Sequence, residues 1–358
     1  MTTTTIEIDE AKRDAFQMSV LEELAGSYGG VMISIGNRLG LYEALDGAGP
    51  IDAAELAART GCAERYVLEW LNGQAAAGNV IYDREAATYE LPAEHAAVLA
   101  DPHSPHLMTP AFECAAALWA DADMAVEAFR SGAGVPWGEH DERLFCGVAA
   151  FYRNGYQLML VPEWLPALDG VVERLEAGAK VADVGCGHGH STVLMAQAFP
   201  ESRFWGFDTH AESIAEARAN AERAGVADRV TFEVATADGY VESGFDLVCF
   251  FDAFHDMGDP VGAAHHARRA LAPEGSLMLV EPNAADDVAD NVGTIAKLYY
   301  GGSTMLCTAH ALSEDGGYAL GAQAGPARLA EVLEEAGFRS FRKAAETPFN
   351  LIAQARVA

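Results

Sequence analysis

Apolar positions in the first third of the chain recur at the three- and four-residue spacing of helices. Residues 10–25 form one predicted helix, and "VMISIGNRLGLYEALDG" (31–47) forms a second with Gly47 as its C-cap. A third, "IDAAELAARTG" (51–61), has Asp52 as the expected N-cap. The turn "GCAE" then leads into "RYVLEWLNGQAAAG" (65–78), which is again helical in pattern.

The stretch "NVIYDREAATYELP" (79–92) reads instead as two short strands joined by a polar turn. Helix, turn, helix and two-stranded wing is the order of a winged helix-turn-helix. Such a unit often binds DNA, but the second helix carries Glu64, Arg65 and Glu69 and is not basic. Because DNA-reading helices need lysine and arginine, we expect a dimerisation and lid module.

Three domains follow from the changes in pattern along the chain. Residues 1–95 form the winged-helix and dimerisation domain, and residues 96–165 form a helical connector interrupted at "DPHSPH" and "GAGVPWGEHD". Residues 166–358 alternate between apolar strands and helices joined by short loops. This alternation predicts a doubly wound α/β domain with a mostly parallel sheet.

The two strands that close the chain differ from the others in their connection. Only "PF" separates "FRSFRKAAET" from "NLIAQARV", which is too short for a parallel crossover. We therefore expect this last pair to be antiparallel. The predicted fold class is a Rossmann-like α/β sheet with an N-terminal, mainly helical winged-helix domain.

Composition narrows the classes of function. The 358 residues carry a formal net charge of −30 at pH 7, which disfavours nucleic acid as a partner; adaptation to high salt is one hypothesis for the acid excess. No apolar run approaches the ~18–20 residues of a membrane helix, and the N-terminus does not read as a signal peptide. The six cysteines form no C-x-x-C pair, which argues against a disulfide framework or zinc site. We expect a cytoplasmic protein with no metal and no membrane partner.

The loop "KVADVGCGHGHS" (180–191) follows the first strand of the predicted sheet. Ligands of such sheets bind at the carboxyl ends of the strands. Gly185, Gly187 and Gly189 allow close approach and positive φ, and Asp208 follows at the end of the next strand, at a separation that suits ribose hydroxyls. The spacing G-x-G-x-G lacks the third glycine of the dinucleotide motif, where His190 stands.

Four segments taken in order strengthen this interpretation. "VADVGCGHG", "GFDT", "ATAD" and "FDLVCFFDAFHDM" resemble the successive motifs of class I S-adenosylmethionine-dependent methyltransferases. The resemblance covers about residues 166–358, and the N-terminal half resembles the winged-helix domain of small-molecule O-methyltransferases. A bacterial group of winged-helix methyltransferases, mostly without assigned substrates, is a closer match in pattern.

This resemblance implies S-adenosylmethionine as cofactor and S-adenosylhomocysteine as product, without a metal. It implies that Asp183 and the backbone of two glycines hold the methionine part of the cofactor, and that Asp208 and its neighbour bind the ribose. It also implies that the residues around Asp238 face the adenine and that the backbone after the fourth strand borders the sulfonium. The implied cofactor residues are Asp183, Gly185, Gly187, Asp208, Thr209, Ala237, Asp238, Gly239, Phe251 and Asp252.

Candidate catalytic residues follow the fourth and fifth strands. "AFHDMGD" places His255 just past the fourth strand, where similar plant enzymes carry the base histidine of an "HDW" segment; Met257 stands at the tryptophan position. Histidine suits proton abstraction from a hydroxyl near neutral pH, although a structural histidine is equally compatible with the pattern. Asp256 either orients His255 or caps the following helix, and Glu281 is a second candidate on this rim, for orienting the substrate.

A long insert, from about residue 284 to 325, contains Cys307, His310 and several glycines. It is either a segment that closes over the substrate or a surface loop without a catalytic role. The acceptor is expected to be a small, lipophilic or aromatic molecule, methylated on oxygen by preference. An N- or C-methyl acceptor, a winged-helix regulator that binds the cofactor, and a nicotinamide enzyme are the alternatives. A homodimer is expected because the N-terminal helices are apolar without an evident cover.

Overall fold

The computed structural model describes residues 8–357, and the chain divides into two compact units. The N-terminal unit comprises residues up to 117 together with 143–151, and the C-terminal unit comprises 118–142 and the residues from 152 onward. Two helices, α6 (Ala111–Ala120) and α8 (Arg143–Met159), run from one unit into the other. No helix among the described residues has the length and apolar character needed to cross a bilayer.

The N-terminal unit has the predicted winged-helix order. Its elements are α1 (Glu10–Arg38), α2 (Leu41–Leu45), α3 (Ala53–Thr60), α4 (Glu64–Ala76), β1 (Ile81–Asp83), β2 (Thr88–Glu90) and α5 (Ala93–Leu99). The wing strands pair antiparallel, and Asp52 caps α3 by accepting from the backbone N–H of Glu55. The HTH core is apolar and includes the buried side chains of Tyr42 and Trp70.

The division of the first helices was predicted wrongly. One helix, α1, runs without a break through Gly26, Gly29 and Gly30, because isolated glycines lower helix propensity without ending a helix. The break comes later, at Gly40 with φ of 65°. Helix α2 ends at Leu45 with Asp46 as its C-cap, so Gly47 is not the cap.

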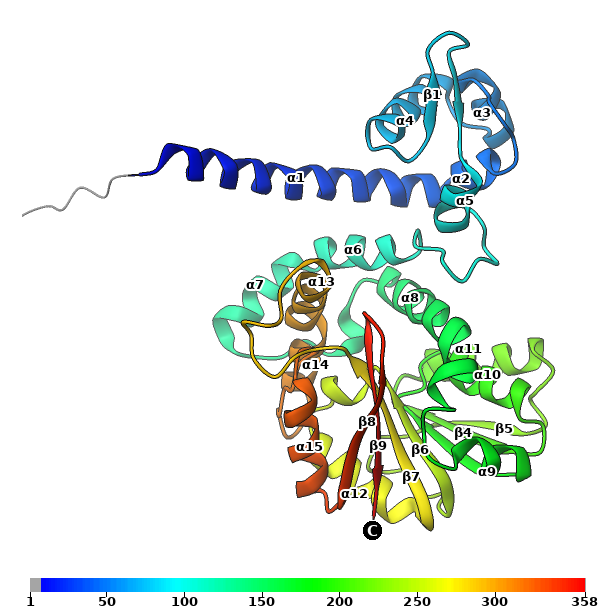
Figure 1. The fold of residues 1–358 in the computed structure, drawn as a ribbon, viewed down its shortest axis with the longest axis vertical. Helices are drawn as coiled ribbons and strands as arrows, with labels where there is room; N and C mark the ends of the chain where they lie inside the picture. The colour runs from blue at the N-terminus through cyan, green and yellow to red at the C-terminus, as the bar shows by residue number, and fades with distance from the viewer. Residues whose placement is uncertain (1–7, 358) are drawn as a thin grey trace, which may run out of the picture. The chain divides into compact units, whose positions relative to one another are not determined.

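The C-terminal unit contains a seven-stranded sheet in the order β5-β4-β3-β6-β7-β9-β8 (Figure 1). Its strands are β3 (Lys180–Val184), β4 (Arg203–Asp208), β5 (Val230–Val234), β6 (Phe245–Phe251), β7 (Leu271–Pro282), β8 (Ser340–Glu346) and β9 (Asn350–Arg356). Strands β3 to β7 pair in parallel, and β9 pairs antiparallel with both β7 and β8. The predicted fold class and the antiparallel final pair are confirmed.

Helices cover both faces of this sheet. They are α9 (Val171–Ala177), α10 (His190–Ala198), α11 (Ala211–Arg223), α12 (Pro260–Ala270) and α15 (Gly325–Glu335). The same unit also contains the helices α7 (Ala122–Ser131), α13 (Thr294–Gly302) and α14 (Thr308–Ser313) and the short turns η1 (Trp137–Glu139), η2 (Leu160–Trp164), η3 (Phe254–Asp256) and η4 (Ser303–Cys307). One core joins α9, α10 and α11 to the sheet, and the other joins α12 and α15 (Figure 1).

Alternation along the strands explains the two cores. Val181 of β3 lies in the first core and Ala182 in the second, because successive side chains of a strand point to opposite faces. The chain runs outward from β3 through β4 to β5 and then returns to place β6 on the other side of β3. A reversal of strand order opens a crevice at the carboxyl ends of the strands, and the candidate site lies there.

Candidate functional site

The glycine-rich loop joins β3 to α10. Gly185, Gly187 and Gly189 all have positive φ, at 76°, 50° and 71°. A Cβ at Gly185 would lie 2.6 Å from Cβ of Ala253, and one at Gly189 would lie 2.5 Å from the ring of Phe232, so both positions require glycine for packing. A Cβ at Gly187 would meet nothing within 4 Å. The backbone at Gly187 therefore faces open space that a ligand can enter.

Asp183 lies in β3 beneath this loop and is fully buried. Its Oδ2 accepts hydrogen bonds from the hydroxyls of Ser191 and Thr192, each at 2.6 Å. Its Oδ1 is buried and has no hydrogen-bond partner among the described residues. Burial raises the pKa of Asp183 to about 6, against the lowering effect of the two hydroxyls. A buried carboxylate oxygen without a partner fits an ammonium group or a bridging water of a bound ligand.

Asp208 ends β4 and connects the strand to the loop. Its Oδ2 accepts from the backbone N–H of Gly187 at 2.8 Å, and its Oδ1 accepts from that of His210 at 2.9 Å. The side chain remains half-buried, and Thr209 beside it is exposed. Each carboxylate oxygen has two lone pairs, so Asp208 keeps acceptor capacity for ribose hydroxyls.

The segment predicted to face the adenine follows β5, the strand beside β4. Asp238 is exposed there and accepts from the hydroxyl of Thr236 at 2.7 Å, while Ala237 is half-buried and Gly239 exposed. The backbone N–H of Ala235 donates to the carbonyl of Asp208, which links this segment to the end of β4. The loop, the two strand-end acids and this segment thus share one edge of the sheet and fit a nucleoside with a cationic tail.

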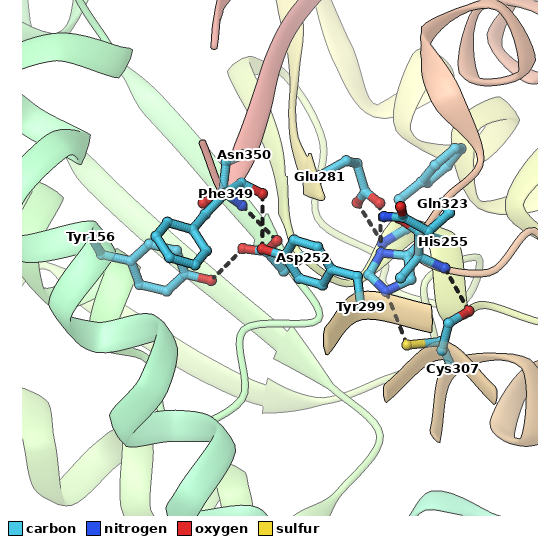
Figure 2. A network of polar contacts seen from close by, with 12 residues as sticks. Tyr156, Asp252, His255, Glu281, Tyr299, Cys307, Gln323, Phe349 and Asn350 are labelled. Carbon is cyan, nitrogen blue, oxygen red and sulfur yellow. Dashed lines mark hydrogen bonds and ion pairs between the residues drawn. The ribbon is translucent and has the colours of Figure 1, made fainter. Parts of the chain in front are cut away.

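Residues after β6 form a buried polar network. Asp252 has a positive φ of 51°, unusual for a residue with a side chain, and is 9 % exposed. Its carboxylate accepts from the hydroxyl of Tyr156 at 3.3 Å and from Nδ2 of Asn350 at 2.7 Å (Figure 2). Burial and the nearby Glu281 raise the pKa of Asp252 well above its usual range. From the sequence we expected the backbone of Phe251 and Asp252 to border the sulfonium. The sequence did not indicate that the side chain of Asp252 forms hydrogen bonds with Tyr156 and Asn350.

His255 lies in the turn η3 and is almost fully buried. Its Nδ1 is 2.6 Å from Oε2 of Glu281, and its Nε2 is 3.2 Å from Sγ of Cys307 (Figure 2). Oε1 of Glu281 accepts from the backbone N–H of Phe254 at 3.1 Å, which fixes the carboxylate. Burial acts to lower the pKa of His255, but Glu281 and Cys307 together raise it well above its usual range.

Asp256 was expected to orient His255 or to cap the next helix. The two ring nitrogens of His255 are instead contacted by Glu281 and Cys307. The capping alternative is wrong, because Asp259 is the N-cap of α12 and accepts from the N–H of Gly262 at 2.8 Å. Asp256 is half-buried beside His255, and burial raises its pKa to about 7.

The insert after β7 is largely helical and supplies Cys307, which sequence reasoning did not connect with His255. Helix α13 passes through the π-helical turn η4 into α14, and Cys307 ends that turn. Short π-helical turns occur often at functional sites, but the sequence carried no clear signal for this one. Within residues 8–357, no group of three or more His, Cys, Asp and Glu is arranged to hold a metal ion.

Comparison with known proteins gives two domain matches. Residues 175–337 match the family described as a methyltransferase domain, and residues 27–101 match the Rv2258c-like winged HTH domain. The 27-O-demethylrifamycin SV methyltransferase of Amycolatopsis mediterranei (strain S699) is 35% identical over 107 residues, which cover 29% of this chain and 39% of that protein. The chain thus matches well under two thirds of that relative's length.

Solved structures are similar over nearly the whole chain. The mitomycin 7-O-methyltransferase superposes with a TM-score of 0.70 at 21% identity, covering 97% of this chain and 100% of the other. Human N-acetylserotonin methyltransferase, in complex with S-adenosylmethionine, superposes with a TM-score of 0.70 at 18% identity and 99% coverage of both chains. At such identities the similarity establishes the fold.

Proposed function

We propose that this chain, whose residues 175–337 match a methyltransferase domain and whose residues 27–101 match a winged HTH domain, transfers a methyl group from S-adenosylmethionine to a hydroxyl of a small, lipophilic or aromatic molecule. The observation that carries the proposal is the buried pair of His255 and Glu281 at the carboxyl ends of β6 and β7. It lies on the same edge of the sheet as the glycine loop of β3. The names of the similar enzymes, which modify small molecules, support it.

The cofactor supplies, when bound, a methyl group on a positively charged sulfur that needs no further activation. The backbone at Gly185 and Gly187, together with Oδ1 of Asp183, is proposed to hold its methionine part. Asp208 accepts from the ribose hydroxyls, with Thr209 beside it. The remaining contacts are proposed for Ala237, Asp238 and Gly239 at the adenine and for Phe251 and Asp252 near the sulfonium.

His255 is the proposed general base. Glu281 holds Nδ1 as the protonated nitrogen, which leaves Nε2 to take the proton from the acceptor hydroxyl. The carboxylate then stabilises the imidazolium that forms. The thiol of Cys307 now lies at Nε2, so the acceptor hydroxyl takes its place there on binding. His255 and Glu281 are 2 % and 1 % exposed, which limits the access of water to the proton transfer.

Methylation of nitrogen or carbon is the nearest alternative. A neutral amine carries its own lone pair and needs no base before attack, so the His255–Glu281 pair favours oxygen. A cofactor-binding regulator is the second alternative, but Arg65 of the helix α4 is paired with Glu69 at 2.5 Å. Nucleic acid therefore remains an unexpected partner, and a salt-dependent mobility shift with DNA would revive the regulator.

The experiment compares acceptor panels that are matched in size: phenols and alcohols in one, and anilines and amines in the other. Purified protein is incubated with S-adenosylmethionine, and S-adenosylhomocysteine is measured by mass spectrometry. We expect turnover with the hydroxyl panel that depends on His255. Turnover confined to amines, or equal turnover by the His255→Ala variant, would overturn the proposed O-methylation.

We also propose that residues 1–95 mediate a homodimer. Helix α1 exposes a series of large apolar side chains along its length: Phe16, Met18, Val20, Leu21, Leu24, Tyr28 and Val31. A monomer rarely leaves such a series in water. Light scattering after size exclusion is expected to give twice the 38.0 kDa chain mass, and the Leu21→Asp/Leu24→Asp variant is expected to give one chain.

A further inference from the structure

Cys307, His255 and Glu281 form one connected series of a thiol, an imidazole and a carboxylate. Sγ of Cys307 lies 3.2 Å from Nε2 of His255, whose Nδ1 lies 2.6 Å from Oε2 of Glu281 (Figure 2). Cys307 is only partly buried, in contrast to the fully buried His255 and Glu281. The proposed methyl transfer uses His255 and Glu281 but gives Cys307 no part.

This geometry has a chemical consequence for the thiol. An imidazole whose Nδ1–H is held by a carboxylate is a good acceptor for a thiol proton at Nε2, and the thiolate that results is the nucleophilic form of cysteine. We propose that Cys307 is an activated thiol, a site of covalent modification by soft electrophiles and peroxides, and that its modification blocks the base. The reactivity of the thiol is independent of the proposed function; only the blocking of methyl transfer rests on it.

The groups around Cys307 set the condition for this activation. Tyr152 of α8 and Tyr299 of α13 lie near the thiol, and burial raises the pKa of both phenols, which keeps them neutral. Glu281 of β7, which contacts the same imidazole, is acidic and opposes a second negative charge. A thiolate at Cys307 is therefore favoured only while His255 holds the transferred proton.

The other cysteines lack this environment and serve as internal references. Cys186 and Cys249 are buried, and burial raises the pKa of both thiols well above the usual range. Burial also raises the pKa of Cys114 to about 12. Cys146 is exposed and reports the reactivity of an ordinary accessible thiol.

Alkylation and oxidation of Cys307 need no reactant other than the electrophile or the peroxide. With iodoacetamide, the proton of Cys307 moves to Nε2 of His255, an S–C bond forms, the C–I bond breaks and iodide leaves. With hydrogen peroxide, the thiolate attacks one oxygen, an S–O bond forms and the O–O bond breaks. The sulfur becomes a sulfenic acid, and the departing hydroxide takes the proton from His255 to give water.

The test is alkylation by iodoacetamide at pH 7, in the absence of any methyl donor, with peptide mass spectrometry of each cysteine over time. An ordinary thiol with a pKa of about 8.5 is only roughly 3% ionised at this pH. We expect Cys307 to react on the order of tenfold faster than Cys146. In the His255→Asn and Glu281→Gln variants, we expect its rate to fall to about that of Cys146.

Labelling of Cys249 in the same samples reveals any variant that unfolds. If one variant unfolds, the other variant decides, and in the native chain Cys307 should in any case react faster than Cys146. Equal rates for Cys307 and Cys146, or a Cys307 rate that is unchanged in a folded His255→Asn variant, would overturn the activated thiol.

Methyl transfer by alkylated protein, compared with alkylated Cys307→Ser protein, tests the blocking separately. We expect activity to be lost in the native chain and kept, relative to its own untreated rate, in the Cys307→Ser variant. Equal retention of activity in both would overturn the blocking while leaving the thiol reactivity in place.

Discussion

Oε2 of Glu281 lies 2.6 Å from Nδ1 of His255, and the pair joins the ends of two neighbouring parallel strands. The other oxygen of Glu281, Oε1, accepts a hydrogen bond from the backbone N–H of Phe254. The carboxylate therefore cannot turn away from the imidazole without losing a buried hydrogen bond. This arrangement gives the neutral imidazole one defined tautomer, in which Nε2 is the acceptor.

Replacement of His255 by alanine is expected to lower methyl transfer by about 10²–10⁴-fold, the usual contribution of a general base. Binding of S-adenosylhomocysteine, measured by calorimetry, is expected to stay unchanged, because the ring contacts Glu281 and Cys307 rather than the glycine loop. His265→Ala, on the exposed side of α12, is the matched control. Unchanged turnover by His255→Ala would remove this residue from the mechanism.

Replacement of Glu281 by glutamine is expected to lower turnover by about 10- to 100-fold, a part of the effect of the base itself. Glu281 raises the pKa of His255, so its loss lowers that pKa. The base then stays neutral to lower pH, and the acid limb of the pH–rate profile is expected to move to lower pH. A profile that keeps its position, at whatever rate, would show that Glu281 does not control the proton of His255.

Asp183 is expected to make stability depend on pH. Its pKa is about 6 in the folded protein against an ordinary value of 3.8, so the folded state binds this proton more tightly. The associated stability is complete below about pH 4 and is lost as pH rises through 6, by about 3 kcal/mol in all. The unfolding free energy of Asp183→Asn minus that of the native chain should therefore increase by about 3 kcal/mol between pH 4 and pH 7. Urea denaturation at a series of pH values checks this; parallel curves would contradict it.

Two glycines of α1 provide a matched pair in the winged-helix unit. A Cβ at Gly36 would lie 2.5 Å from Cζ2 of Trp70 and 2.7 Å from Cε2 of Tyr42, whereas one at Gly26 would meet nothing within 4 Å. Gly36→Ala is expected to destabilise the unit by about 1–3 kcal/mol through overpacking. Gly26→Ala is expected to stabilise it by up to about 1 kcal/mol. Hydrogen exchange of α4 measures both, and the same sign for both would refute the packing account.

The sequence predicted the strands, loops and site residues that can be recognised from a short stretch of the chain. The glycine loop, Asp208 and His255 each lie at the end of an apolar strand, so their common edge follows from the parallel order of the sheet. The antiparallel final pair followed from a connection of two residues. The continuity of α1 did not follow, because Gly26, Gly29 and Gly30 weaken the helix pattern between the two predicted helices without ending the helix.

Contacts between distant segments were the part that the sequence could not supply. Cys307 is 52 residues from His255, Tyr156 is 96 residues from Asp252, and Asn350 is 98 residues from it. Each of these polar side chains lies in a stretch whose pattern is explained by its own helix or strand. The packing of α8, of the insert and of β9 against the parallel strands brings them to the site.

The most direct test of the central claim is calorimetric titration of the purified chain with S-adenosylmethionine and S-adenosylhomocysteine, with NAD as the reference ligand. We predict one-to-one binding of both sulfur nucleosides and no heat with NAD. Asp208→Asn, which keeps an oxygen for the N–H of Gly187, should weaken binding by about 10- to 100-fold through loss of charged hydrogen bonds. The exposed Asp228→Asn should leave it unchanged. Absence of heat with either nucleoside, or native affinity in the Asp208→Asn variant, would contradict the account.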